Sequence, residues 1–169
     1  MIGKTTKYTN AESHNGRHLE TADEITTRLN TLLADEHLLY VKTRDYHWNV
    51  QGLHFVALHG LFERQYESLA LREDIIAEQV RKLEGKANGT MHAFLGGTQL
   101  SEEPGHDLAE QAMIGNLLAD HEAMMARLEG DIEFANENAD EGTVDMLVQT
   151  LREHQEMAWM LRSLTHSSN

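Results

Sequence analysis

The chain has 169 residues, of which 40% are hydrophobic and 25% charged, and its formal net charge is −14 at pH 7. This length and balance suit a single soluble domain with a sizeable core, and the acidity disfavours nucleic-acid and membrane surfaces while attracting cations. Because the sequence has no cysteine, disulfides and thiolate metal sites are excluded, and any metal must bind His, Asp or Glu, as iron, manganese or zinc can.

Helix is the regular structure that the composition favours. The chain has one proline and only 6% aromatic residues, so helix breakers and strand-forming residues are few. No apolar run near the N-terminus resembles a signal peptide, and no stretch approaches the roughly 18 apolar residues of a membrane span. We therefore expect an all-α protein of the cytoplasm, free in solution or associated with the nucleoid.

The first part of the chain changes from a polar tail to a helix near residue 21. Residues 1–20 lack any apolar period, so we expect a mobile tail. Thr21 and Glu24 have the spacing of a capping box, and apolar residues then recur at helical intervals until about Trp48. The cations of this tail are Lys4, Lys7 and Arg17.

Three further long helices are expected, with Gly85 as the C-terminal stop of the second. The apolar stripe of the second helix comprises Phe55, Phe62, Tyr66, Leu69, Ile76, Val80 and Leu83. The expected ranges are residues 53–83, 107–135 and 143–164, with a long connection over 85–105 that contains a short helix near 91–95 and a short tail over 166–169.

One long connection between the second and third helices is the connectivity of a ferritin-like four-helix bundle. In that arrangement the second and third helices run parallel, and the connection must span the length of the bundle. We therefore expect one bundle domain over residues 21–165. A four-helix bundle also serves structural and signalling proteins, so a function must come from a site.

The second helix carries two pairs of metal-binding side chains. His59 and Glu63 are four residues apart and share a helix face, as do Asp74 and Glu78. The eleven residues from Glu63 to Asp74 make about three turns and a rise of about 16 Å. Metal–ligand bonds of about 2 Å cannot bridge that rise, so one chain offers each ion only half of a site.

A symmetric dimer would complete both halves. If two copies of the second helix cross antiparallel about a twofold axis near Ser68 and Leu69, the His-bearing pair of one copy faces the carboxylate pair of the other. The short turn after the first helix places His47 beside His59. Each site would then combine imidazoles from one chain with carboxylates from its neighbour and leave positions open for iron and an oxidant. The alternative is that both pairs are ordinary solvated surface pairs.

These residues resemble those of the Dps family, the DNA-binding proteins from starved cells, which are mini-ferritins of the ferritin-like superfamily. The resemblance extends over about residues 21–165 and is most specific in the spacing of His47, His59, Asp74 and Glu78. Ordinary ferritins instead use E-x-x-H pairs inside one bundle. The segments that carry the resemblance are YHWNVQGLHFVALHGLFERQY, EDIIAEQV, LLADHEAM and DEGTVDMLVQTLREHQEMAWMLRSL.

The resemblance implies a hollow homo-dodecamer built from dimers. It implies ferroxidase sites between subunits, each holding two irons, with zinc as a substitute metal. Ferrous iron and hydrogen peroxide would be the substrates, and ferric oxyhydroxide would be stored inside, which protects the cell against oxidative stress. By the same resemblance His47, His59 and Glu63 would bind iron from one subunit, and Asp74 and Glu78 from the other.

The resemblance also implies roles away from the ligands. Trp48 would donate electrons to intermediates at the site, or simply pack against it. Asp145 matches a position in the acidic threefold pores through which the family takes up iron, with Asp140 and Glu141 as companions. These acids also suit the N-terminus of a helix.

DNA binding is the alternative function that the family name raises. The tail has only three cations and the body is acidic, so contacts with phosphate would be few. His14 and His18 could strengthen such contacts when protonated, or could hold a metal. We expect His37, His121 and His154, which lie near the apolar stripes, to be hydrogen-bonded core or interface residues.

Overall fold

The computed structural model describes residues 9–138 and 140–165, with side chains from Ala22 onward except that of His106. Throughout these residues every regular element is a helix, as the sequence predicts. The elements are α1 (Thr9–Asn49), α2 (Phe55–Lys82), α3 (Met91–Gly97), the single 3-10 turn η1 (Gly105–Asp107), α4 (Glu110–Glu137) and α5 (Glu141–Thr165).

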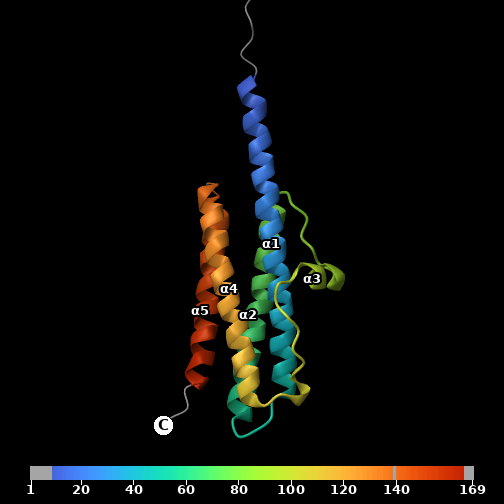
Figure 1. The fold of residues 1–169 in the computed structure, drawn as a ribbon, viewed down its shortest axis with the longest axis vertical. Helices are drawn as coiled ribbons and strands as arrows, with labels where there is room; N and C mark the ends of the chain where they lie inside the picture. Colours follow the sequence, from blue (N-terminus) through green and yellow to red (C-terminus); the bar gives the residue numbers. More distant parts are fainter. Residues whose placement is uncertain (1–8, 139, 166–169) are drawn as a thin grey trace, which may run out of the picture.

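The four long helices form an up-and-down bundle with one crossover (Figure 1). Helices α1 and α2 form one antiparallel hairpin, and α4 and α5 form the other. Helices α2 and α4 run in the same direction, and the connection between them returns along the whole bundle on the outside of α1 (Figure 1). It carries the short helix α3, which packs against α1. This is the expected ferritin-like connectivity.

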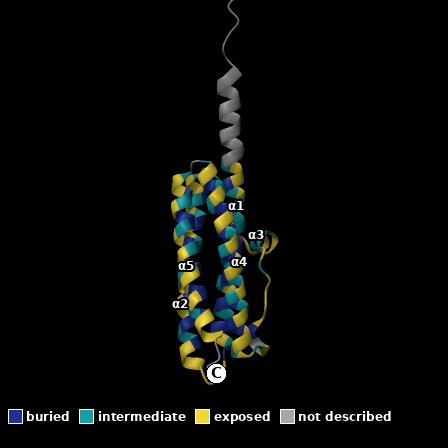
Figure 2. Cartoon of the chain, turned by 60° about the vertical axis from the view of Figure 1, so that its left-hand side comes forward, coloured by how far each residue is buried: buried dark blue, intermediate teal, exposed yellow. Residues whose placement is uncertain are grey.

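The core lies between the four long helices, whose buried faces point inward (Figure 2). Phe62, Leu69, Ile76 and Val80 of α2 are fully buried, as their helical spacing predicts. Phe55 was expected in the same stripe but is 43% exposed. It is the first residue of α2, where the chain has only just left the turn, and its ring contacts that of His59.

Ion pairs join α1 to the antiparallel α4 at intervals of one heptad along α1, and all of their side chains except that of Arg28 are largely buried. Arg28 pairs with Asp131, Asp35 with Arg127, and Lys42 with Asp120. Asp35 also holds the crossover, because its Oδ1 accepts hydrogen bonds from the Thr98 hydroxyl and from the backbone N–H groups of Gln99 and Leu100. These contacts fix the register between the two hairpins.

The first helix begins at Thr9, twelve residues earlier than expected. Thr21 therefore lies inside α1, and the predicted capping box at Thr21 and Glu24 is wrong. No proline interrupts residues 9–49, and once a packed helix is nucleated each further residue adds to it at little cost. The expected mobile tail thus overlaps this helix over residues 9–20, and residues 1–8 lie outside the described part of the chain.

The second helix ends in a Schellman motif, one residue earlier than the glycine suggests. The N–H of Gly85 donates to the carbonyl of Val80 at 3.0 Å, and the N–H of Glu84 donates to that of Arg81 at 3.1 Å. Glu84, with φ of 63°, takes the left-handed position where glycine was expected. Gly85 is needed for a different reason, since a Cβ there would lie 2.5 Å from the Cγ2 of Thr26.

Candidate metal centre

The end of α1 and the first turns of α2 bring two imidazoles together. The rings of His47 and His59 are stacked, with centroids 3.7 Å apart and planes inclined by 22°. The Nδ1 of His47 lies 2.8 Å from the carbonyl oxygen of His59, and the Nδ1 of His59 lies 2.9 Å from the carbonyl oxygen of His47. The sequence predicted this proximity from the short turn between the two helices.

These reciprocal hydrogen bonds determine the tautomers. A backbone carbonyl only accepts, so each Nδ1 must carry the hydrogen. In the neutral rings each Nε2 then keeps its lone pair, which is the form in which histidine binds a metal. A second hydrogen bond that fixes the ring in this way is also what orients histidine ligands in metal sites.

The carboxylates proposed as ligands lie further along α2. Glu63, Asp74 and Glu78 are all exposed, and the nearest described cation to Glu78 is Lys82, 4.0 Å away. Among the described side chains of one chain, no group of three or more His, Asp or Glu converges on a point that could hold a metal. One protomer therefore presents a histidine half, formed by the end of α1 and the start of α2, and a carboxylate half further along α2.

Aromatic side chains surround the histidine half. Tyr66 meets the His47 ring edge-on, with centroids 5.2 Å apart, and Phe55 lies 5.1 Å from His59. Trp48 is 64% exposed, and the guanidinium of Arg44 lies over its ring at 5.0 Å. Apart from this contact, most of the indole surface is open to solvent or to another molecule.

Residue Glu73, which precedes Asp74, was missed by the sequence analysis. It accepts a hydrogen bond from His37 Nδ1 at 3.0 Å, and that ring stacks on Phe94 of α3. Burial raises the pKa of Glu73, and the contact with His37 only partly offsets this. The signal was His37 beside the apolar stripe, which was expected to be a hydrogen-bonded core or interface residue but whose partner was not assigned.

The acids near the start of α5 are placed differently from one another. Asp140 caps the helix, since its carboxylate accepts from the backbone N–H of Thr143 at 3.1 Å and from the Thr143 hydroxyl at 2.6 Å. Glu141 and Asp145 are exposed, and Asp145 accepts a hydrogen bond from Gln149. Their pore role stays a prediction. Five other predicted residues lie outside the described side chains, namely Lys4, Lys7, His14, Arg17 and His18.

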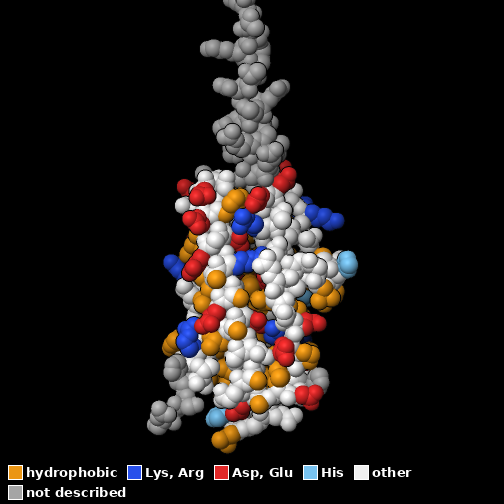
Figure 3. Space-filling view, viewed as in Figure 1, with side chains coloured by type: hydrophobic (Ala, Val, Ile, Leu, Met, Phe, Trp, Pro, Cys, Tyr) orange, Lys and Arg blue, Asp and Glu red, His pale blue; other side chains and the backbone are white. Residues whose placement is uncertain are grey.

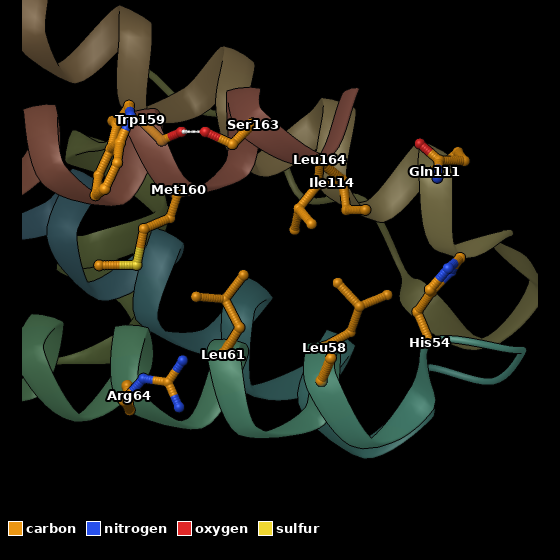
Figure 4. Close-up of a pocket in the computed structure, with 11 residues that line it drawn as sticks. His54, Leu58, Leu61, Arg64, Gln111, Ile114, Trp159, Met160, Ser163 and Leu164 are labelled. Carbon is orange, nitrogen blue, oxygen red and sulfur yellow. Dashed lines mark hydrogen bonds between the residues drawn. The ribbon is translucent and has the colours of Figure 1, made fainter. Parts of the chain in front are cut away.

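An apolar groove of about 430 Å³ lies between α2, α4 and α5, lined at one end by His54 but not by His47 or His59 (Figure 4). Leu58 and Leu61 face Met160 and Leu164 across it, and Trp159 stands at one end. None of the proposed ligands lines this groove. Its chemistry suits a protein contact rather than a metal.

Hydrophobic side chains are also exposed on the outer surface near the candidate ligands. Those of α3 are visible at the edge of the bundle among acidic groups (Figure 3). None of the described helices is long and apolar enough to cross a membrane. The exposed large hydrophobic residues between positions 41 and 95 are Val41, Trp48, Leu53, Phe55, Val56, Leu71, Ile75, Met91 and Leu95.

Comparison with known proteins places this arrangement in a family. The model of the ferritin-like domain matches residues 26–167. A low temperature-induced protein from Nostoc sp., itself uncharacterized, is 44% identical over 136 residues, which cover 80% of this chain and 76% of that protein. DNA protection during starvation protein 2 from Bacillus anthracis is 35% identical over 80% of this chain and 92% of its own length.

Solved structures give the same result. Dps from Thermosynechococcus elongatus superposes with a TM-score of 0.87 at 26% identity, over 90% of this chain and 97% of that one. Dps from Vibrio cholerae, described as a ferritin-like diiron-carboxylate protein, gives 0.83 at 28% identity over 87% and 92% of the two chains. The bundle is thus a ferritin-like domain. Within that class, the chain belongs to the Dps family of mini-ferritins.

Proposed function

We propose that this protein oxidises ferrous iron with hydrogen peroxide at sites shared between two subunits and stores the ferric product inside a dodecameric shell. The observation that carries the proposal is the reciprocal hydrogen bonding of His47 and His59. It leaves both Nε2 atoms as metal-binding lone pairs in a protomer that has no complete metal site among its described side chains.

The missing ligands would come from the partner's α2. Asp74 and Glu78 share their exposed face with two apolar side chains, Leu71 and Ile75, which are 68% and 39% exposed. Exposed apolar groups beside these carboxylates favour a subunit contact over a solvated face. An antiparallel crossing of two α2 helices would bury the apolar groups and bring each carboxylate half to a histidine half, with Glu63 as the fifth ligand.

The chemistry follows from this mixed ligand set. Two ferrous ions in each site would give one electron each to a peroxide, whose O–O bond breaks. The oxygen atoms enter ferric oxyhydroxide, together with oxygen from water, and protons are released. Few protein ligands leave coordination positions open for the peroxide. Zinc fits the same His and carboxylate donors and would compete with iron.

A closed shell needs more than one kind of contact. Twofold pairing through α2 makes dimers only, and a cage of tetrahedral symmetry also needs threefold contacts. The apolar groove between Leu58, Leu61 and Leu164 supplies a second surface for another copy of the chain. The acids near Asp145 would then line a pore for iron entry.

Complementation between two defective chains tests the shared site. One variant is His47→Ala with His59→Ala, and the other is Asp74→Ala with Glu78→Ala. Each homo-oligomer should lose rapid ferrous oxidation by peroxide. Co-expressed chains that pair at random should recover about one quarter of the wild-type sites, because half of the dimers are mixed and each has one intact site.

The controls separate assembly from chemistry. Every shell should have a mass about twelve times the 19.2 kDa of one chain. His92→Ala, which changes an exposed histidine of α3, should oxidise iron at the wild-type rate. Mixed shells that remain as inactive as their parents would overturn the shared site, and so would a stable monomer that oxidises iron.

A further inference from the structure

A chain of three hydrogen-bonded titratable side chains crosses the middle of the bundle. Glu36 of α1, His154 of α5 and His121 of α4 are each at most 1% exposed. His154 Nε2 lies 2.8 Å from Glu36 Oε1, and its Nδ1 lies 2.8 Å from the Nδ1 of His121. Three of the four long helices therefore meet through polar atoms inside the bundle.

The hydrogen bonds have a fixed direction when Glu36 is ionised. The carboxylate only accepts, so His154 Nε2 carries a hydrogen, and the neutral His154 accepts at Nδ1 from the N–H of His121. His121 Nε2 is then a lone pair with no partner. Whichever ring takes one more proton, the result is an N–H at His121 Nε2 that is buried and has no acceptor.

The charged groups around Glu36, His154 and His121 do not compensate the charge of such a proton. On α1 and α4, Lys42 is paired with Asp120, next to His121, and Asp35 is paired with Arg127. On α2 and α5, Arg72 is paired with Glu153, next to His154. Glu73 of α2 lies near enough to Glu36 for their charges to interact, and it is itself bonded to His37. In the described hydrogen bonds Glu36 is thus the one carboxylate that the two imidazoles contact.

We propose that Glu36, His154 and His121 form an acid-sensitive latch, which joins α1, α5 and α4 at neutral pH and loosens their packing when the pH falls. The proposal does not depend on iron, because none of the three residues is a proposed ligand. Acid would weaken the bundle from within, whatever the metal content of the shell.

The direction follows from linkage. Burial, and then the neighbouring His154, hold the pKa of His121 well below its usual value of 6.5. Below about pH 6.5 the unfolded chain takes up a proton at this residue while the folded chain does not. The free energy of unfolding therefore decreases as the pH is lowered. The loss continues down to the lowered pKa of the folded state.

Thermal unfolding of the assembled protein between about pH 7.5 and 5 tests the latch. The wild-type midpoint should fall by roughly 3 °C for each pH unit below about 6.5 on account of this residue. His121→Gln keeps a hydrogen-bonding side chain that does not titrate, and should remove that part of the slope. His92→Gln, the matched change at an exposed histidine, should leave the slope as in the wild type.

Hydrogen exchange on the wild type supplies a second measurement that needs no variant. After correction for the intrinsic rate, peptides around His121 and His154 should lose protection by up to about tenfold per pH unit below about 6.5. Peptides of α3 should change less. Parallel midpoint slopes in wild type and His121→Gln would overturn the latch. Loss of protection that is uniform along the chain would do the same.

Discussion

His47 and His59 hold each other in place, because each ring donates its Nδ1 hydrogen to the backbone carbonyl of the other residue. Neither ring is therefore an independent ligand. Removing one imidazole leaves the backbone carbonyl that accepts from the other ring, but takes away the ring that is stacked on it with centroids 3.7 Å apart. The remaining ring therefore loses a contact that helps to orient it, and loss of such a contact typically costs about 10–100-fold in metal affinity.

Single substitutions at this pair should consequently be non-additive. We expect His47→Ala and His59→Ala each to weaken anaerobic ferrous iron binding by about 10–100-fold. The double variant should lose less than the product of the two effects, because each single change already disturbs both rings. Titration calorimetry of the three variants measures this coupling. Losses that multiply would mean that the two rings act separately.

DNA binding by this protein should be weak at neutral pH. The chain carries 28 acidic against 14 basic residues, and a surface of that balance repels phosphate. A gel-shift series should show no complex near physiological salt at pH 7.5. Any complex that forms at lower pH should disappear as salt increases. Retention of DNA at high salt and neutral pH would favour a DNA-compacting role instead.

Asp140 and Asp145 should respond differently to substitution, although both lie near the start of α5. Asp140 caps the helix through Thr143, so Asp140→Ala should cost about 1 kcal/mol of stability. Asp145 is exposed, so Asp145→Asn should leave the unfolding midpoint almost unchanged while slowing oxidation at low ferrous iron, if it lines a pore. Stopped-flow oxidation and thermal unfolding separate the two effects. An unchanged oxidation rate in Asp145→Asn would remove that residue from iron entry.

Helical periodicity was sufficient for most of the fold. The apolar stripes, the crossover and the short helix within it were predictable because each depends on local spacing and on breakers such as the glycines of the connection. The start of α1 was not predictable, because extension of a helix into a polar segment leaves no strong pattern in the sequence. The left-handed Glu84 was not predictable either, since this conformation is rare for glutamate and the neighbouring Gly85 was the expected left-handed residue. Gly85 is instead required by its close approach to Thr26, which lies far away in the sequence.

The histidine half of the candidate site was predictable because a short turn joins its two residues. The buried Glu36 was missed, although its position within the apolar stripe of α1 was a signal: a charged residue there needs a partner. That partner, His154, lies 118 positions away along the chain. Pairing over such a separation depends on the register of the two hairpins, which no local pattern determines.

The end of α2 offers a pair of opposite substitutions. Glu84→Gly should stabilise the protein by about 0.5–1 kcal/mol, because glycine adopts the left-handed conformation without the cost of a Cβ. Gly85→Ala should destabilise it, because the new Cβ would lie 2.5 Å from Thr26. Chemical denaturation measures both, and Thr26→Ala combined with Gly85→Ala should recover part of the loss. A destabilising Glu84→Gly would contradict the assigned strain.

Substitutions at the buried pair of Lys42 and Asp120 should affect stability more than those at Glu84 and Gly85, and their effects should be coupled. The ammonium lies 2.6 Å from the carboxylate, and the two side chains are 5% and 14% exposed. Lys42→Met leaves the anion without its cation and should cost about 3–5 kcal/mol at neutral pH. Asp120→Leu in the same chain removes the unpaired charge and should restore much of that loss.

The pH dependence of Lys42→Met provides a separate check on this pair. Burial already raises the pKa of Asp120 above its usual value although Lys42 opposes the shift, and without Lys42 the pKa should rise further. The protonated carboxyl is then favoured in the folded state, so the variant should regain stability relative to the wild type as the pH falls towards that raised value. Denaturation curves at several pH values compare the two proteins. A stability difference that stays constant with pH would show that Asp120 does not carry the unpaired charge.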